Sequence, residues 1–290
     1  MVSPADYSRI TVEDWHLKVL LGQWNSRLQS RVVELVRAQA AAHHPQTVAV
    51  DCGSGSSEQE FFLKVFHRRG GFWALKDLVR PTKATRFWRQ GLALSAAGFQ
   101  VPLTIAVGAN GRWRMATREF VLTEKIDGVP VPFYLGLNFS TDRSMSALKR
   151  AAIRRLAKML RLFHDLGFVH GDLVASNIFV AARARAGVDF YLMDNDRTRH
   201  YPYWMLQSRW KRNLIQLNRM PLPGISLQDR MRFFHAYLNV QRLSHGDRQL
   251  ARWLELKTRQ RRKECDGVDP TVSFRRLMRW TPETASARDV

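Results

Sequence analysis

In the segment "FVHGDLVASNIFV", residues 168–180, a histidine, an aspartate and an asparagine interrupt a largely apolar run. Side chains of these three types are common in functional sites. His170, Asp172 and Asn177 lie between a predicted helix at 144–166 and a predicted strand, "NIFV". The helix is indicated by apolar residues that recur along one face, with basic residues on the rest. A surface turn would tolerate the three polar residues, but their spacing is specific. We therefore take this segment as the starting point for a functional site.

A second acidic residue follows at the end of the next predicted strand. Asp194 stands seventeen positions after Asn177, where an apolar segment ends in "DND". The segments "NIFV" and "DFYLM" are typical of two short strands, joined here by the turn "AARARAGV". Such a hairpin would bring Asn177 and Asp194 to the same end.

Glycines and a lysine precede this region in "CGSGSSEQEFFLK", residues 52–64. Gly53 and Gly55 allow backbone amides to approach phosphate groups, although a Gly/Ser run is equally consistent with a plain hairpin turn. Lys64 lies inside an apolar strand, where an unpaired ammonium would be costly. Phosphate oxygens explain a lysine at that position best.

The residues from His170 to Asn177 fit the kinase catalytic-loop pattern, in which four residues separate an aspartate from an asparagine. The spacing has a chemical reason. The aspartate must point at an incoming hydroxyl, and the asparagine must reach a metal on the nucleotide phosphates. Asp196 and Arg197, just after Asp194, are consistent either with a substrate or metal contact or with a local ion pair.

The secondary-structure pattern predicts an α+β fold of two lobes. Apolar residues near helical spacing predict one or two helices over 12–42, so residues 1–45 are expected to form an N-terminal helical extension. Residues 46–125 alternate between strand patterns and one helix at 82–98, which predicts a small β-rich lobe. Residues 126–290 are richer in helix patterns and predict a larger lobe that ends in basic helices.

The sequence resembles the protein-kinase-like superfamily and, within it, the bacterial lipopolysaccharide core kinases, which phosphorylate Kdo or heptose sugars. The resemblance covers about residues 46–245. It rests on the catalytic loop, on the Asp-x-Asp-Arg form of the segment at 194–197, and on the arginine-rich segment after the lysine strand. No Ala-Pro-Glu segment or long activation loop follows Asp194, which argues against a conventional protein kinase.

The resemblance implies a role for each matching residue. Asp172 would be the catalytic aspartate and His170 its structural support. Asn177 and Asp194 would hold Mg²⁺. The nucleotide, ATP, would be bound by Lys64 at the α/β-phosphates, by Gly53 and Gly55 along the loop, and by the backbone of Glu124 near adenine.

One position departs from the superfamily pattern. A helix glutamate normally pairs with the nucleotide-binding lysine, and the matching position here is Phe87. Either another carboxylate, such as Glu58 or Glu60, orients Lys64, or the enzyme is slow or inactive.

The net charge is unusual, with 46 Lys and Arg against 25 Asp and Glu, a balance of +21. Such an excess favours anionic partners. The basic segments at 258–264 and 274–280 are consistent with solvated helix faces, with nucleic-acid binding or with an anionic membrane surface. No base-stacking or groove-reading motif accompanies them, so no nucleic-acid partner is expected.

The composition also bounds the cellular location. Only Cys52 and Cys265 are present, so no disulfide framework is expected. The first residues lack the apolar core of a signal peptide, and no apolar run reaches the roughly 18 to 20 residues of a membrane span. We expect a cytoplasmic protein that associates peripherally with the inner membrane, where a lipid-linked core oligosaccharide would be its acceptor.

Two alternatives remain open at this point. A kinase for another small molecule or for a protein would share every catalytic residue. A catalytically silent pseudokinase that serves as a binding scaffold would be consistent with the missing helix glutamate.

Overall fold

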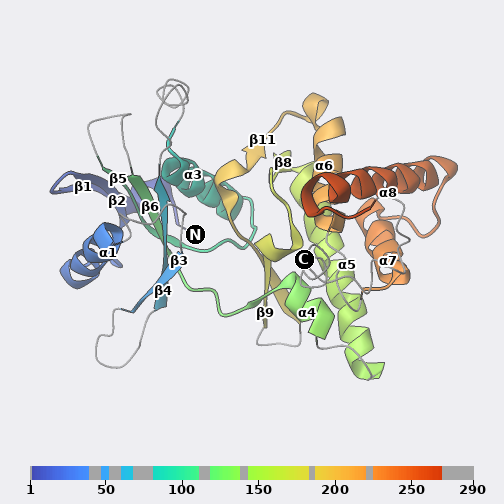
Figure 1. The fold of residues 1–290 in the computed structure, drawn as a ribbon, viewed down its shortest axis with the longest axis horizontal. Coiled ribbons are helices and arrows are strands. Elements are labelled where there is room, and N and C mark those ends of the chain that lie inside the picture. The colour runs from blue at the N-terminus through green and yellow to red at the C-terminus, as the bar shows by residue number, and fades with distance from the viewer. Residues whose placement is uncertain are drawn as a thin grey trace. The chain divides into compact units, whose positions relative to one another are not determined.

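The computed structural model describes residues 2–38, 47–51, 60–67, 81–110, 118–137, 143–182, 187–219 and 225–269 (Figure 1). The chain divides into two compact units. The first comprises Met1–Asp127 together with Leu192–Arg197, and the second comprises Gly128–Tyr191 together with Thr198–Val290. The main sheet lies in the first unit and the longest helices lie in the second, as the predicted α+β class requires.

The first unit is built on a six-stranded sheet with the strand order β1-β2-β5-β6-β4-β3. All neighbouring strands in it run antiparallel. The strand predicted to contain Lys64 and the other strand patterns expected within residues 46–125 are confirmed. The bounds are β1 (Tyr7–Val12), β2 (Trp15–Leu20), β3 (Thr47–Asp51), β4 (Glu60–His67), β5 (Thr104–Asn110) and β6 (Arg118–Glu124), with a short 3₁₀ turn η1 (Pro4–Asp6) before β1.

The predicted helical extension at residues 1–45 is wrong in its first half. Strands β1 and β2 form a hairpin there and supply one edge of the sheet. Trp15, Leu17 and Val19 are buried while His16 and Lys18 are not, which is the two-residue period of a strand. The same apolar residues also fit helical spacing approximately, and this ambiguity misled the prediction. A helix begins only afterwards, at α1 (Ser26–Ala38).

Two helices cover opposite faces of the sheet. Helix α1 packs Leu28, Val32 and Val36 against odd-numbered residues of β4 such as Leu63. Helix α3 (Lys83–Ala96), which confirms the predicted helix at 82–98, packs against even-numbered Phe66. Because successive residues of a strand point to opposite faces, Lys64 lies on the same face as Phe66, the face that α3 covers.

The second unit is mainly helical. The long helix predicted at 144–166 is confirmed as α5, which packs against α7, while α6 packs against α8. Small sheets have the orders β10-β9-β7 and β11-β8. The bounds are β7 (Val129–Pro130), α4 (Val131–Leu137), α5 (Arg143–Asp165), β8 (Phe168–Val169), η4 (Ala175–Asn177), β9 (Ile178–Ala182), β10 (Val188–Leu192), η5 (Asn195–Arg197, in the first unit), β11 (Arg199–His200), η6 (Tyr203–Met205), α6 (Leu206–Arg219), α7 (Leu227–Leu238) and α8 (His245–Asp266).

Candidate active site

The loop from His170 to Asn177 follows strand β8 and belongs wholly to the second unit. Gly171 has a φ of +77°, a left-handed conformation that a glycine adopts without steric cost. The amide of Asn177 donates to the backbone carbonyl of Asp172 at 3.0 Å, and the Val174 N–H donates to the same carbonyl at 2.9 Å. The structure thus brings Asp172 and Asn177 together in one compact loop, as their spacing predicted.

His170 is fully buried at the start of this loop. Its backbone N–H donates to the side-chain oxygen of Asn213 on α6 at 3.0 Å. This burial suits a residue that supports the loop rather than one that meets a substrate.

Lys64 and Asp194 meet within the first unit. Lys64 Nζ lies 2.5 Å from Asp194 Oδ1, and the two side chains are 29% and 34% exposed. Asp194 lies two residues after the end of β10 and has a φ of +54°, which is uncommon for a residue other than glycine. The pair joins two residues that are 130 positions apart in the sequence.

Asp196 anchors the segment after Asp194 to helix α3. It is 8% exposed, and Arg86 Nη2 of α3 lies 3.8 Å from its carboxylate. Burial, and then the charge of Asp194, raise the pKa of Asp196, whereas the nearby cations oppose this rise. The ion-pair partner that the structure gives Asp196 is thus Arg86 of α3 rather than Arg197 next to it, and a contact of this segment with substrate or metal stays a prediction.

Helix α3 carries no acidic residue, and Phe87 is a core residue in it. The carboxylate that pairs with Lys64 is instead Asp194. Glu60 forms an ion pair with Lys125, and Glu58 lies outside the described residues. Within the described residues the partner of Lys64 is thus Asp194 rather than Glu60, although the sequence suggested Asp194 as a metal ligand.

The other predicted nucleotide-binding residues have different outcomes. Glu124 ends β6, where its N–H donates to the Leu103 carbonyl at 3.0 Å and its carboxylate accepts from the Leu103 N–H at 3.1 Å. Its side chain is therefore occupied within the sheet, which leaves the backbone carbonyl for any contact with adenine. Gly53 and Gly55 lie outside the described residues.

The residues present fit a magnesium–nucleotide site in kind. Mg²⁺ is usually held by one or two carboxylates together with phosphate oxygens and water, so a dedicated cage of acidic side chains is not needed. In the first unit Asp194 offers a partly exposed carboxylate beside an ammonium, and in the second unit, taken by itself, Asn177 offers an amide oxygen. In the parts of the chain that the structure describes, no group of three or more His, Cys, Asp or Glu could hold a metal ion.

Two residues of the site were missed by the sequence reasoning. Asn213 and Gln216 lie on α6 and make hydrogen bonds to the backbone around Asp172. The available signal was a pair of amide side chains three residues apart beside the apolar Leu214 and Leu217.

Part of the basic charge is also structural. In α8, Arg262 is 1% exposed and donates to the carbonyls of Arg219 and Asn218 at the end of α6. Arg259 and Arg261 form ion pairs with glutamates of their own helix. The segment at 258–264 is therefore a helix in which Thr258 and Arg262 are buried while most other residues are exposed, and the segment at 274–280 lies outside the described residues.

Comparisons with solved structures support the kinase-like fold. A structure described as WaaP in complex with acyl carrier protein matches with a TM-score of 0.55 and 19% identity, over 78% of this chain and 91% of that one. The kinase domain of Mycobacterium tuberculosis PknI matches with a TM-score of 0.35 and 12% identity, over 81% and 78%. The second score is too low to bear on the fold.

Comparisons of the sequence identify the family. No curated protein matches the chain. The profile of the lipopolysaccharide kinase (Kdo/WaaP) family matches residues 59–237, a region that contains the lysine strand, the loop around Asp172 and Asp194. None of the helices in the described ranges is long and apolar enough to cross a membrane. Since the matched region covers more than half of the sequence, this protein is a kinase that belongs to the lipopolysaccharide kinase (Kdo/WaaP) family.

Proposed function

We propose that this protein transfers the γ-phosphate of ATP to a hydroxyl of an inner-core lipopolysaccharide sugar, Kdo or heptose. The observation that carries the proposal is the loop in which Asn177 holds the backbone of Asp172, in a chain whose Lys64 meets Asp194. These are the four residues that phosphoryl transfer of the kinase type requires, and they occur in the required order.

Each residue has a distinct task in the proposed reaction. Asp172 orients the acceptor hydroxyl and accepts its proton as the bond to phosphorus forms. Lys64 binds the α/β-phosphate oxygens. Asn177 and Asp194 would hold Mg²⁺, which when bound offsets the negative charge on the phosphates. His170 supports the loop from within the core.

The remaining nucleotide contacts are also proposals. Gly53 and Gly55 would place backbone amides against the phosphates, and the carbonyl of Glu124 would meet the adenine amino group. These contacts use backbone atoms only, so the side chain of Glu124 is not required. Substitution of Glu124 should therefore affect ATP binding less than substitution of Lys64.

The central test is the Asp172→Ala variant with γ-labelled ATP and purified lipopolysaccharide whose core phosphates have been removed. We expect transfer to fall at least about a thousandfold, since the general base and the positioning of the hydroxyl are both lost. Stabilisation by Mg-ATP in a thermal-shift titration should persist. The matched control is Asp189→Ala, which removes a partly exposed carboxylate of the same unit that pairs with Arg155. Equal transfer by the Asp172→Ala variant and the wild type would contradict the proposed mechanism.

The same assay separates the two alternatives. Labelling of free sugars or of proteins in preference to lipopolysaccharide would identify a different kinase. Absence of both Mg-ATP stabilisation and transfer would identify a scaffold that has lost catalysis.

We also propose that the protein works at an anionic membrane surface. Helix α5 presents several exposed cations, namely Arg150, Arg154, Arg155 and Lys158. Each cation near an anionic leaflet contributes on the order of 1 kcal/mol. Replacing Arg150, Arg154 and Lys158 by glutamate should therefore weaken sedimentation with anionic vesicles at least about a hundredfold. Equal binding of the wild type to anionic and zwitterionic vesicles would contradict the proposal.

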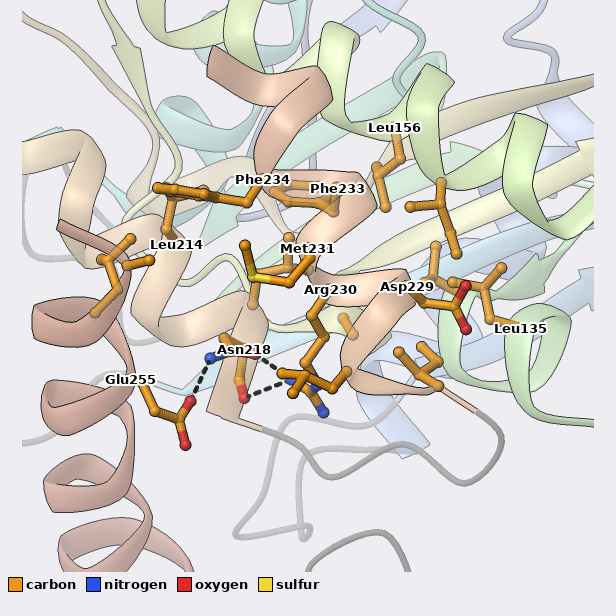
Figure 2. Close-up of a pocket in the computed structure, with 18 of the residues that line it drawn as sticks. Leu135, Leu156, Leu214, Asn218, Asp229, Arg230, Met231, Phe233, Phe234 and Glu255 are labelled. Carbon is orange, nitrogen blue, oxygen red and sulfur yellow. Dashed lines mark hydrogen bonds between the residues drawn. The ribbon is translucent and has the colours of Figure 1, made fainter. Parts of the chain in front are cut away.

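A third proposal concerns a protein partner. The second unit contains an apolar cavity of about 310 Å³ lined by residues from α4 to α8. Figure 2 shows Leu135, Leu156, Leu214 and Phe234 around it. Such a cavity is of a size and polarity that suit an apolar ligand. Because the similar WaaP structure contains an acyl carrier protein, we propose that an acyl carrier protein binds here with its acyl chain in the cavity.

This partner is tested by comparing acyl-loaded and unloaded acyl carrier protein in a binding titration with the purified kinase. The acyl-loaded form should bind at least about tenfold tighter, because a chain in the cavity removes apolar surface from water. Equal affinities for the two forms would show that the chain does not enter the cavity.

A further inference from the structure

The backbone on both sides of Asp172 is held by one side chain. Gln216 of α6 accepts a hydrogen bond from the Leu173 N–H at 3.2 Å and donates one to the Gly171 carbonyl at 3.0 Å. The left-handed Gly171 takes the chain out of the β8 ladder, so these backbone groups need partners outside a strand. The amide of Gln216 thus brackets Asp172 from the residue before it to the residue after it.

A second amide fixes the direction of the first. Asn213 Nδ2 lies 3.1 Å from Gln216 Oε1, and Asn213 Oδ1 lies 3.0 Å from the backbone N–H of His170. Since a carbonyl only accepts and a backbone N–H only donates, each amide has one orientation that satisfies all of its neighbours. Gln216 must turn its nitrogen to Gly171, and Asn213 must turn its nitrogen to Gln216.

A buried histidine and a tyrosine complete the network. His164 Nε2 of α5 lies 3.1 Å from Asn213 Oδ1, and His164 Nδ1 lies 2.8 Å from the hydroxyl of Tyr237 on α7. The oxygen of Asn213 already accepts, so Nε2 carries the proton and Nδ1 accepts from the tyrosine. His164 and Tyr237 are 3% and 1% exposed, which means that water does not compete for these bonds.

The hydrogen bonds therefore form a single directed chain that starts in the packed helices and ends at the loop. It runs from the hydroxyl of Tyr237 through His164 and Asn213 to Gln216, and from there to the backbone that flanks Asp172. A side chain on a loop is held in a defined position when rigid elements support the loop. Here α5, α6 and α7 each contribute at least one residue to the hydrogen-bond chain that supports it.

We infer that Gln216 is the positioning residue for Asp172 in phosphoryl transfer, and that Asn213 positions Gln216. The inference rests on the proposed function, in which Asp172 orients the acceptor hydroxyl. Gln216 acts through the backbone and has no role in holding ATP. Its loss should lower kcat without a matching change in the KM for ATP.

The first test is the Gln216→Met variant, which keeps the length of the side chain and removes both hydrogen bonds to the loop together with the one from Asn213. Misplacement of a reacting group by about 1 Å costs on the order of a hundredfold, so we expect kcat to fall about tenfold to a hundredfold. The KM for ATP should stay within about twofold. The matched control is Thr258→Val, because Thr258 is also buried in the same unit but bonds to Leu254 of α8 and Asn218 of α6 rather than to the loop.

The second test uses pH to separate positioning from folding. In the Gln216→Glu variant an ionised carboxylate accepts from Leu173 but repels the Gly171 carbonyl. A protonated carboxyl donates to that carbonyl, as the amide does. Burial raises the pKa of a carboxyl. We therefore expect the ratio of variant to wild-type kcat to rise as pH is lowered from about 8 to about 6.

The outcomes decide the inference. A wild-type kcat in Gln216→Met, or a pH-independent ratio for Gln216→Glu, would overturn it. Should Gln216→Met fail to fold, by circular dichroism and thermal unfolding compared with Thr258→Val, the Gln216→Glu ratio alone decides. A wild-type enzyme whose transfer does not depend on Asp172 would overturn the proposed function and this inference together. Asp172-dependent transfer with normal Gln216 variants would overturn this inference only.

Discussion

Acidification should destabilise this protein through one buried histidine, His164. Its ring is 3% exposed and packs among Tyr237, Asn213 and Phe163. Burial lowers the pKa of His164 from 6.5 to about 4, although the hydrogen bond to Asn213 partly opposes this. The unfolded chain therefore takes up the proton at a higher pH than the folded chain does.

The sign and the size of the effect follow from this difference. Between about pH 6.5 and pH 4 the unfolded state binds more protons, so the free energy of unfolding falls as the pH falls. Above this interval the histidine is neutral in both states, and below it the histidine is charged in both. A difference of about 2.5 between the two pKa values corresponds to about 3 kcal/mol. That is a large part of the roughly 5 to 15 kcal/mol that a folded domain has.

The assay is urea unfolding at several pH values from about 7.5 to 4.5, with the wild type and the His164→Gln variant. The variant should be less stable at neutral pH, because it loses the fit of the ring, but its stability should depend less on pH. A matched control is His245→Gln, which changes an exposed histidine at the start of α8 and should keep the wild-type slope. Parallel curves for the wild type and His164→Gln would refute the reasoning.

Two further predictions concern the first unit. Asp194→Asn removes the partner of Lys64, and because both side chains are about one-third exposed the stability loss should be below about 1 kcal/mol, while phosphate transfer should be abolished. Urea unfolding and the transfer assay measure the two effects separately. Glu119→Ala leaves the buried N–H of Ala84 at the start of α3 without its acceptor and should cost about 1 to 2 kcal/mol, whereas Glu119→Gln, which keeps an oxygen there, should cost less in thermal unfolding.

The sequence predicted the parts of the site that are close together in the chain. The spacing of Asp172 and Asn177 implied one loop. The structure confirms it, because a separation of five positions keeps the amide of Asn177 within hydrogen-bonding reach of the Asp172 carbonyl. Long helices such as α5 were equally predictable, since their apolar period extends over many turns. Short strands offer fewer repeats, and for β2 the residues Trp15, Leu17 and Leu20 fit two periods at once.

Contacts between distant segments were beyond the sequence pattern. The hydrogen bonds of Gln216 to the loop span 43 and 45 positions, and those of His164 span 49 and 73. An amide in a helix pattern is equally consistent with a solvated face, and only burial shows otherwise. The buried state is what makes such residues matter, because an unpaired polar group there costs more than the bond contributes.

The residue that pairs with Lys64 was likewise not predictable from the sequence pattern. The sequence establishes that α3 has no acid at Phe87, but it cannot show what replaces that acid. In the fold, Phe87 joins an apolar cluster, and the neighbouring Arg86 places its Nη2 3.8 Å from the carboxylate of Asp196, so α3 brings a cation to the Asp-x-Asp-Arg segment. The carboxylate that pairs with Lys64 comes from Asp194 instead. The absence of a glutamate at Phe87 is therefore not by itself a reason to regard Lys64 as unpaired, because Asp194 of the same unit supplies the carboxylate.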